Sequence, residues 1–211
     1  MPALAELIAG YRRFRTGPWR YEQGHYERLD AGQDPDIMVI SCADSRVEPA
    51  EIFDTIPGQM FVVRNVANLV PPYGNDLGRD GVSAALEYAV KALAVRYILV
   101  LGHCHCGGIR AAIDALEGAS SGEFIAPWVE IAAAARDRVA AKMPGASGAD
   151  LAAALEHEAI RSSLANLMTF PFVREAVAAG RLRLQGAWFE IASGDLRLLA
   201  PETGEFDTVS V

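Results

Sequence analysis

Three short apolar segments, separated by stretches with helical periodicity, constrain the fold of this chain more than any other feature. Residues 37–41, 60–63 and 97–101 are apolar almost throughout and do not alternate with polar residues. Strands of this kind are buried on both faces and are typical of a parallel sheet. Helices are predicted in four further segments, residues 82–93, 107–116, 127–142 and 149–169. We therefore predict an α/β protein with a mostly parallel β-sheet flanked by helices on both faces.

The two ends of the chain carry different patterns. Residues 182–191 and 196–199 predict a closing pair of strands that adds an antiparallel edge near the C-terminus. The apolar residues of segment 2–16 recur at helical spacing, which predicts an N-terminal helix that is either an arm or part of the core. We expect one domain over the whole chain, with residues 1–34 as a helical arm and residues 35–211 as the core.

The charge of the chain limits its partners. Its 19 basic and 27 acidic side chains give a formal net charge of −8, which disfavours nucleic acid and anionic membranes. No apolar run approaches the ~18 residues of a membrane span. The basic residues Arg12, Arg13 and Arg15 follow the first apolar residues, whereas a secretory signal begins with basic ones. We therefore expect a cytoplasmic protein, unless a leader has been removed.

Residues with metal-binding or charged side chains follow each predicted strand. Cys42 comes directly after the first strand, Arg64 and Asn65 after the second, and His103 and Cys106 after the third. The carboxyl ends of parallel strands share one edge of the sheet, and α/β proteins bind their ligands at that edge. Two thiolates and one imidazole suit Zn²⁺ and leave a fourth position open for catalysis.

Cys106 stands where the next predicted helix begins. The N-terminus of a helix lowers the pKa of a thiol and so favours the thiolate that a metal ion requires. Gly107 and Gly108 follow directly, and the absence of a side chain at both positions leaves room above the site for a substrate.

Asp44 and Arg46 lie two residues apart just beyond Cys42, so in an extended chain they point the same way. One interpretation is an exposed ion pair that contributes ~0–1 kcal/mol to stability. Another is that Asp44 hydrogen-bonds a water on the zinc ion while Arg46 holds the carboxylate. A third makes Asp44 the fourth ligand of a closed, inactive site. The pair also argues against the alternative that Cys42, His103 and Cys106 are only buried core residues.

These residues belong to an ordered set of motifs that resembles the β-class carbonic anhydrases over most of the chain. The motifs are Cys42-Ala43-Asp44-Ser45-Arg46, Pro57-Gly58, Phe61 to Asn68, Gly81, Ala85 to Val90, Gly102-His103 and Cys106-Gly107-Gly108, with weaker matches at Ser163 to Leu167 and Pro171 to Val173. The resemblance implies one zinc ion per subunit on Cys42, His103 and Cys106. It also implies a catalytic pair formed by Asp44 and Arg46.

The resemblance further implies a substrate pocket lined from two subunits. Gln33 would hydrogen-bond the substrate, Phe61, Val66 and Tyr88 would form its apolar walls, and Gly107 would lie beside it. We expect a homodimer or a dimer of dimers, in which the apolar face of the N-terminal helix packs on another subunit.

Two positions separate the branches of this family. In the plant-like branch a Gln stands nine residues before the first Cys ligand, the place that Gln33 holds here. The other branch carries a Trp three residues before that Cys, as part of an inhibitory bicarbonate site, and this chain has Val39 there. The resemblance is therefore to the plant-like branch, without strong bicarbonate inhibition through that site.

The activity implied by the resemblance is reversible hydration of carbon dioxide to bicarbonate and a proton through zinc-bound hydroxide. The alternatives are a related zinc hydrolase acting on carbonyl sulfide or carbon disulfide, and a non-catalytic zinc-binding regulatory protein. Between the ligands His103 and Cys106 stand Cys104 and His105. Cys104 is a bystander thiol or a redox group, and His105 is a surface or packing residue or passes protons near the site.

Overall fold

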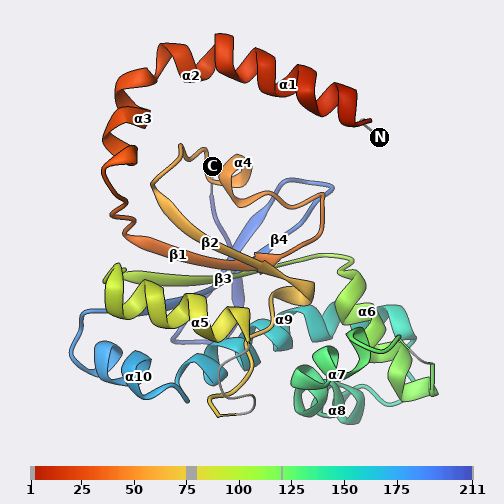
Figure 1. The fold of residues 1–211 in the computed structure, drawn as a ribbon. Helices are drawn as coiled ribbons and strands as arrows, with labels where there is room; N and C mark the ends of the chain where they lie inside the picture. The colour runs from red at the N-terminus through yellow and green to blue at the C-terminus, as the bar shows by residue number, and fades with distance from the viewer. Residues whose placement is uncertain (1–2, 75–79, 120, 211) are drawn as a thin grey trace. The chain divides into compact units, whose positions relative to one another are not determined.

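The computed structural model describes residues 3–74, 80–119 and 121–210 of the 211-residue chain (Figure 1). The chain divides into two compact units, Met1–Asp34 and Pro35–Val211. That the two together act as one zinc-enzyme domain stays a prediction. None of the helices in the described part of the chain combines the length and the apolar character needed to cross a lipid bilayer.

The described part of the N-terminal unit contains three helices, α1 (Leu4–Thr16), α2 (Pro18–Tyr21) and α3 (Gln23–Asp30). Pro18 opens α2 at a position where the missing N–H of proline costs no helical hydrogen bond. Phe14 of α1 packs edge-on against Tyr26 of α3, with ring centroids 5.9 Å apart. The predicted N-terminal helix is thus confirmed, and its apolar residues, Leu4, Leu7, Ile8 and Tyr11, are exposed.

The core unit is built on a six-stranded sheet with the strand order β2-β1-β3-β4-β5-β6. Its strands are β1 (Ile37–Cys42), β2 (Met60–Asn65), β3 (Tyr97–His103), β4 (Arg183–Phe189), β5 (Leu196–Leu199) and β6 (Phe206–Thr208). Strand β1 pairs in parallel with β2 and β3, and β3 pairs in parallel with β4, whereas β5 and β6 run antiparallel to their neighbours. The predicted parallel sheet with an antiparallel edge near the C-terminus is confirmed.

The C-terminal strands differ in detail from the sequence prediction. Strand β4 extends the parallel part of the sheet beside β3, so the antiparallel edge begins only at β5. Strand β6 was not predicted. It is three residues long and has Phe206 as its single large apolar residue, which is too short for a pattern of alternation to be recognised.

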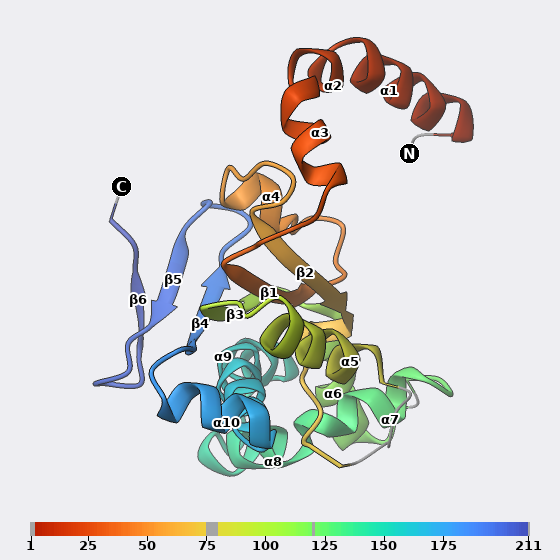
Figure 2. The ribbon, with the colours of Figure 1, turned by 60° about the vertical axis from the view of Figure 1, so that its left-hand side comes forward.

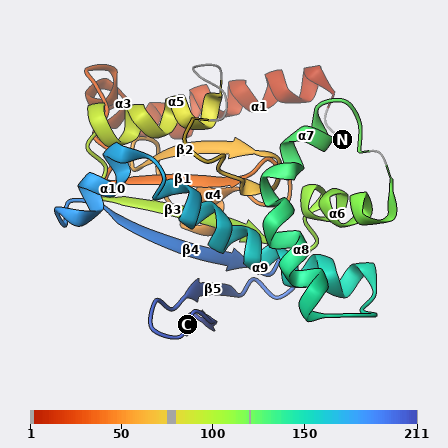
Figure 3. The same ribbon diagram turned by 90° about the horizontal axis from the view of Figure 1, so that it is seen from below.

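Helices cover the two faces of the sheet unequally. Most lie on one face or beyond one end of it, and the short α4 (Pro49–Ile52) lies on the other face (Figures 1, 2 and 3). The helices of the larger group are α5 (Gly81–Glu87), which a π-helical turn at Tyr88–Ala92 extends, α6 (Gly107–Asp114), α7 (Ile125–Val129), α8 (Ala133–Lys142), α9 (Gly148–Leu167) and α10 (Pro171–Ala178). The prediction of helices on both faces is confirmed in this unequal form.

The main core fills the space between the sheet and helices α5, α9 and α10. Strands contribute Met38, Ile40, Ile98 and Val100, and the helices contribute Leu86, Ile160, Leu167 and Val173. Burial of these side chains supplies most of the free energy that holds the helices on the sheet.

Two glycines on neighbouring strands allow α9 to approach the sheet closely. A Cβ on Gly102 of β3 would lie 2.7 Å from Cδ1 of Ile160. A Cβ on Gly186 of β4 would lie 2.8 Å from Cγ2 of the same residue and 3.2 Å from Cδ1 of Leu164. The helix therefore rests directly on backbone at these two points, because no side chain intervenes.

Replacing Gly186 by Ala should destabilise the protein. The new methyl group meets Cγ2 of Ile160, which is fixed by the stiff χ1 of a β-branched side chain, so the free energy of unfolding should fall by about 1–3 kcal/mol. Gly81→Ala is the matched control, since a Cβ there meets no atom of the described residues within 4 Å. Urea unfolding of the two variants measures the difference, and equal stabilities would contradict the close approach of α9.

Candidate metal centre and active site

The three predicted metal ligands end neighbouring elements at the carboxyl edge of the sheet. Cys42 is the last residue of β1, His103 is the last residue of β3, and Cys106 directly precedes α6. Because β1 and β3 are parallel neighbours, their last residues lie at the same edge. His103 and Cys106 are 61 and 64 positions from Cys42 in the sequence. The order of the strands in the sheet brings the three residues together.

The ligand atoms of Cys42, His103 and Cys106 form a compact, buried cluster. All three lie within 4.8 Å of one another, and the two Sγ atoms are 3.8 Å apart. Nδ1 of His103 is 2.8 Å from the carbonyl oxygen of Cys104, so this nitrogen carries the proton and Nε2 offers its lone pair to the cluster. Nε2 is buried and has no hydrogen-bond partner among the described residues.

This geometry fits a tetrahedral metal ion. Two sulfur ligands about 2.3 Å from a zinc ion, at the tetrahedral angle, lie roughly 3.8 Å from each other, which agrees with the observed Sγ–Sγ distance of 3.8 Å. A buried imidazole nitrogen without a partner is costly unless a metal ion or a donor completes it. Cys42, His103 and Cys106 could therefore hold a metal ion, and sulfur and nitrogen donors favour Zn²⁺ over Mg²⁺ or Ca²⁺.

The two cysteines differ in their protonation. A hydrogen bond from the Cys106 thiol lowers the pKa of Cys42 to about 4, against the opposing effect of burial. The same contact, together with burial, raises the pKa of Cys106. Burial lowers the pKa of His103, but the neighbouring Cys42 thiolate outweighs burial and raises it. The pair thus retains one proton, which a divalent cation would displace on binding.

Asp44 and Arg46 form a closed ion pair beside the cluster. Nε of Arg46 donates to Oδ1 of Asp44 at 2.9 Å, and Nη2 donates to Oδ2 at 2.7 Å. This pairing holds the pKa of Asp44 well below its usual range, so the carboxylate is ionised at neutral pH. Oδ2 of Asp44 lies 4.0 Å from Nε2 of His103. The carboxylate therefore faces the cluster while the guanidinium occupies both of its oxygens.

A second guanidinium, that of Arg64, holds the backbone of the same loop. It donates to the carbonyl oxygens of Cys42 at 3.0 Å, Asp44 at 2.7 Å and Val47 at 2.6 Å. The sequence placed Arg64 at this edge of the sheet but suggested no role for it. The three carbonyl groups come within reach of Arg64 because the chain turns after Cys42, and this turn is visible only in the structure.

Val66 and Gly107 line a common cavity of about 350 Å³, and Gly107 directly follows the candidate ligand Cys106. Gly107 opens α6 directly after Cys106, and a Cβ on it would meet nothing within 4 Å. The missing side chain of Gly107 therefore leaves open space one residue after Cys106, and a role of Gly107 in substrate binding stays a prediction.

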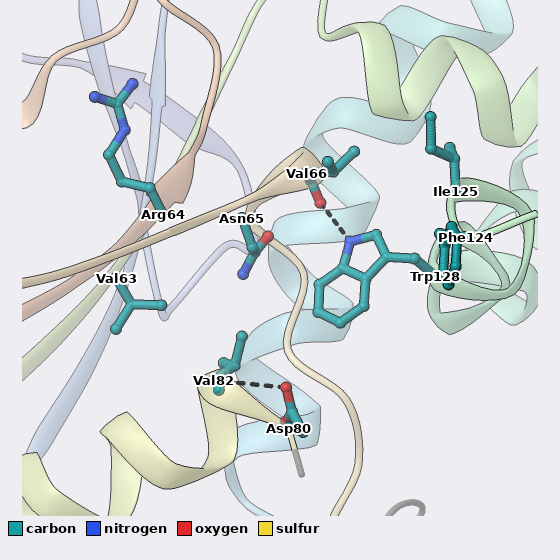
Figure 4. Close-up of a pocket in the computed structure, with 10 residues that line it drawn as sticks. Val63, Arg64, Asn65, Val66, Asp80, Val82, Phe124, Ile125 and Trp128 are labelled. Atoms are coloured by element: carbon teal, nitrogen blue, oxygen red, sulfur yellow. Dashed lines mark hydrogen bonds between the residues drawn. The ribbon is translucent and has the colours of Figure 1, made fainter.

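Val66 also borders a second, larger cavity of about 490 Å³ (Figure 4). The indole of Trp128 forms one wall of it and donates from Nε1 to the carbonyl oxygen of Val66 at 2.7 Å. Phe124 and Ile125 from the segment at the start of α7 add apolar surface, and Val82 lies across from them. Trp128 was not singled out from the sequence, because an isolated Trp in an alanine-rich segment gives no functional pattern.

The other predicted pocket residues do not join the metal cluster within the described chain. The rings of Phe61 and Tyr88 pack against each other at a tilt of 39°, with centroids 5.8 Å apart, and neither residue lines the two cavities that Val66 borders. Gln33 belongs to the N-terminal unit and is exposed. Their roles in substrate binding stay predictions.

Cys104 and His105 are not part of the cluster formed by Cys42, His103 and Cys106. Sγ of Cys104 is buried and accepts a hydrogen bond from the Ile191 amide at 3.2 Å, and burial raises the pKa of this thiol. His105 adopts the left-handed backbone region, with φ of 53°, and its carbonyl oxygen accepts from Arg46. Neither a redox role for Cys104 nor a proton-transfer role for His105 is tested by these contacts.

Fold and site together define a class of protein. It is an α/β protein with a mostly parallel sheet and a buried Cys–His–Cys cluster at the carboxyl edge, where an ionised aspartate stands beside the ligands. Such a centre has three protein ligands, as catalytic zinc sites do, whereas structural zinc sites have four.

Comparison with known proteins identifies the family. The family model described as carbonic anhydrase matches residues 37–196. Beta carbonic anhydrase 3 of Arabidopsis thaliana is 38% identical over 200 residues, which cover 94% of this chain and 77% of that protein. The chain therefore belongs to the β-carbonic anhydrase family and is an enzyme of that family.

Solved structures of the family share the fold. The β-carbonic anhydrase CcaA superposes with a TM-score of 0.93 at 32% identity, covering 99% of this chain and 92% of that one. A structure of tetrameric β-carbonic anhydrases from the ascomycete Sordaria macrospora has a TM-score of 0.76 at 29% identity, covering 93% of each chain.

Substitution of the cysteines should separate ligand from bystander. Cys106→Ser should lower bound zinc from about one ion per chain to about a tenth of that or less, because a hydroxyl is a poor replacement for a thiolate ligand. Cys104→Ser is the matched control and should keep its zinc, since Sγ of Cys104 faces the Ile191 amide. Metal analysis of the purified, dialysed variants measures both. Loss of zinc in the Cys104 variant alone would contradict this assignment of ligands.

Proposed function

We propose that this protein catalyses the zinc-dependent, reversible hydration of carbon dioxide to bicarbonate and a proton. Membership of the β-carbonic anhydrase family supports the reaction. The observation that carries the proposal is that Nε2 of His103 has no hydrogen-bond partner among the described residues. It lies with two cysteine sulfurs and only 4.0 Å from the Asp44 carboxylate. This combination offers metal ligands and an ionised hydrogen-bond acceptor at the same place.

Zinc on Cys42, His103 and Cys106 would lower the pKa of a water molecule from about 15.7 toward 7 and so supply hydroxide at neutral pH. Asp44 would accept the hydrogen bond of that water and orient its lone pair toward the substrate. Because Asp44 is already ionised, it can act as an acceptor over the whole physiological pH range.

Arg46 decides which of the two states of Asp44 is populated. Both carboxylate oxygens are engaged by its guanidinium, in a bidentate arrangement that also fixes their direction. Such pairing favours the open state, in which Asp44 does not ligate the metal. We propose that the closed state requires this pair to break first.

The substrate is a small apolar molecule, and the surroundings of the cluster suit it. Val66 and Ile125 add apolar surface to the cavity that Gly107 also lines, and Gly107 directly follows the candidate ligand Cys106. We propose that carbon dioxide binds there, and that Gln33, Phe61 and Tyr88 complete the pocket as predicted. Gln33 would donate its amide hydrogen bond to an oxygen of the substrate and so orient it.

Assembly would supply those residues from a second copy of the chain. The apolar face of α1, with Leu4 73% and Leu7 59% exposed, is suited to packing on another protein surface. The relatives from Sordaria macrospora are described as tetrameric. We propose a homodimer or a dimer of dimers for this chain, and membership of the plant-like branch. A cytoplasmic location stays a prediction.

The protein should hydrate carbon dioxide, with activity that rises between about pH 7 and 9 as the zinc-bound water loses its proton. Asp44 does not contribute to that rise, because Arg46 holds its pKa well below the window and it stays ionised throughout. Stopped-flow assays of the zinc-loaded protein with carbon dioxide and with carbonyl sulfide measure the preference. Hydrolysis of carbonyl sulfide without hydration of carbon dioxide would favour the related zinc hydrolase.

Asp44→Asn should keep zinc but lose about 100-fold in activity, because the amide cannot serve as an ionised acceptor. Asp36→Asn is the matched control: Asp36 also pairs with an arginine, Arg96, but through exposed side chains at the opposite end of β1. Activity and zinc content are measured on the same samples. Full activity in the Asp44 variant would show that the Asp44–Arg46 pair is not needed for catalysis. Wild-type protein that binds zinc but has no activity would support the alternative of a regulatory protein.

A further inference from the structure

A buried carboxylate lies beneath the loop that carries two of the metal ligands. Glu156 of α9 is only 5% exposed. Its Oε1 accepts a hydrogen bond from the backbone N–H of Cys106 at 3.2 Å, and its Oε2 accepts one from Nε1 of Trp188 at 3.2 Å. Burial of a carboxylate carries a large desolvation cost, so a residue of this kind is retained only where its contacts matter.

The peptide bond that Glu156 contacts is also held from its other side. That bond joins His105 to Cys106: its N–H donates to Glu156, and its carbonyl oxygen accepts from Nη2 of Arg46 at 3.1 Å. The same Nη2 donates to Oδ2 of Asp44 at 2.7 Å. A single peptide unit therefore connects the buried carboxylate to the Asp44–Arg46 pair.

The backbone at this point requires such support. His105 has φ of 53°, a left-handed conformation that is unfavourable for a residue with a Cβ. Arg46 cannot provide the support alone, because its side chain is 48% exposed and free to exchange its bonds with water. Glu156 is the buried and therefore the more rigid of the two partners of this peptide.

We propose that Glu156 is a positioning residue of this active site, which fixes the His105–Cys106 peptide and thereby the direction of the Cys106 sulfur and the seat of Arg46. This inference rests on the metal site and activity proposed above. It assigns Glu156 no contact with the substrate or the metal ion, only with the loop that carries the ligand.

The two oxygens of Glu156 bind different donors, which makes the proposal separable from a role in folding. If Glu156 acts through Trp188 to stabilise the core, Trp188→Phe should reproduce its loss, since this substitution removes the indole donor together with part of a buried ring. If Glu156 acts on the Cys106 amide, Trp188→Phe should leave the metal site nearly unchanged.

The experiment compares zinc affinity, by competition with a chromophoric chelator, in Glu156→Gln, Trp188→Phe and the double variant. Glu156→Gln should weaken zinc binding at least about tenfold, as loss of a residue that orients a ligand does. The glutamine amide has one oxygen acceptor, whereas the Cys106 N–H and the Trp188 indole N–H are two donors. The NH₂ group of the glutamine must therefore face one of these two N–H groups, which is unfavourable. In the double variant that conflict is removed, because the amide oxygen can accept from Cys106 alone, and affinity should recover to within about threefold of wild type.

Two further measurements test whether the change in zinc affinity is specific to Glu156 and arises from a change in ligand geometry. Glu158→Gln is the matched control on the same helix, since its carboxylate pairs with Arg138 and Arg161 and does not bind the metal loop. It should keep wild-type zinc affinity. The absorption bands of the cobalt-substituted proteins report ligand geometry directly, and they should change in Glu156→Gln and return in the double variant.

Several outcomes would overturn the proposal. The first is equal zinc affinity in the Glu156→Gln and Glu158→Gln variants. The second is weakened zinc binding in the single variant Trp188→Phe. The third is a double variant whose zinc affinity is no higher than that of Glu156→Gln. If Glu156→Gln does not fold, the double variant decides by itself, because the proposal requires it to bind zinc nearly as wild type does. Failure of the wild-type protein to bind zinc would instead count against the proposed function.

Discussion

The contact between two buried cysteine sulfurs is the interaction on which the rest of this structure depends. Sγ of Cys42 and Sγ of Cys106 approach to 3.8 Å, and the two residues are only 5% and 2% exposed, so ionising both thiols at once is unfavourable without a neighbouring cation. In the absence of a cation one proton is shared, which lowers the pKa of one thiol and raises that of the other. A divalent ion bound here would satisfy both thiolates and the His103 nitrogen at once. The fold therefore holds two thiol groups so close that their thiolates would repel each other, and a bound metal ion would remove that repulsion.

Keeping this arrangement requires rigid support for loops that have no regular structure of their own. Arg64 binds three carbonyl groups of the segment that follows Cys42, and Arg46 links that segment to the carbonyl of His105. Each of these contacts is charge-assisted and has more than one acceptor, which gives directional rigidity that a single neutral hydrogen bond does not. Arginines that bind backbone carbonyl groups, and none of the three candidate ligand side chains, thus help to position the candidate ligands.

The sequence predicted the ligand set but not this support, and the reason is physical. Cys42, His103 and Cys106 could be found because apolar strands mark where the chain reaches the carboxyl edge and because thiol and imidazole side chains are rare there. Arg64 was placed at the same edge without a role, since its acceptors are backbone carbonyls that carry no signal in the sequence. Glu156 was missed because a glutamate in a helix is ordinarily exposed, and only packing shows that it is buried. Phe61 and Tyr88 were named by family resemblance, and a single chain brings them to each other and not to the cluster.

Helix α9 connects the stability of the fold to the geometry of the site. Ile160, which rests on Gly102 and Gly186, and Glu156, which lies under Cys106, are four residues apart and so share one face of the helix. Gly102 immediately precedes the ligand His103, so the point where the helix contacts the sheet lies next to the point where it supports the metal loop. A shift of α9 away from the sheet would move the carboxylate and the loop together. The close packing of α9 on Gly102 and Gly186 therefore fixes the distance between the Glu156 carboxylate and the Cys106 amide. Core packing is in this way part of the geometry of the candidate metal site.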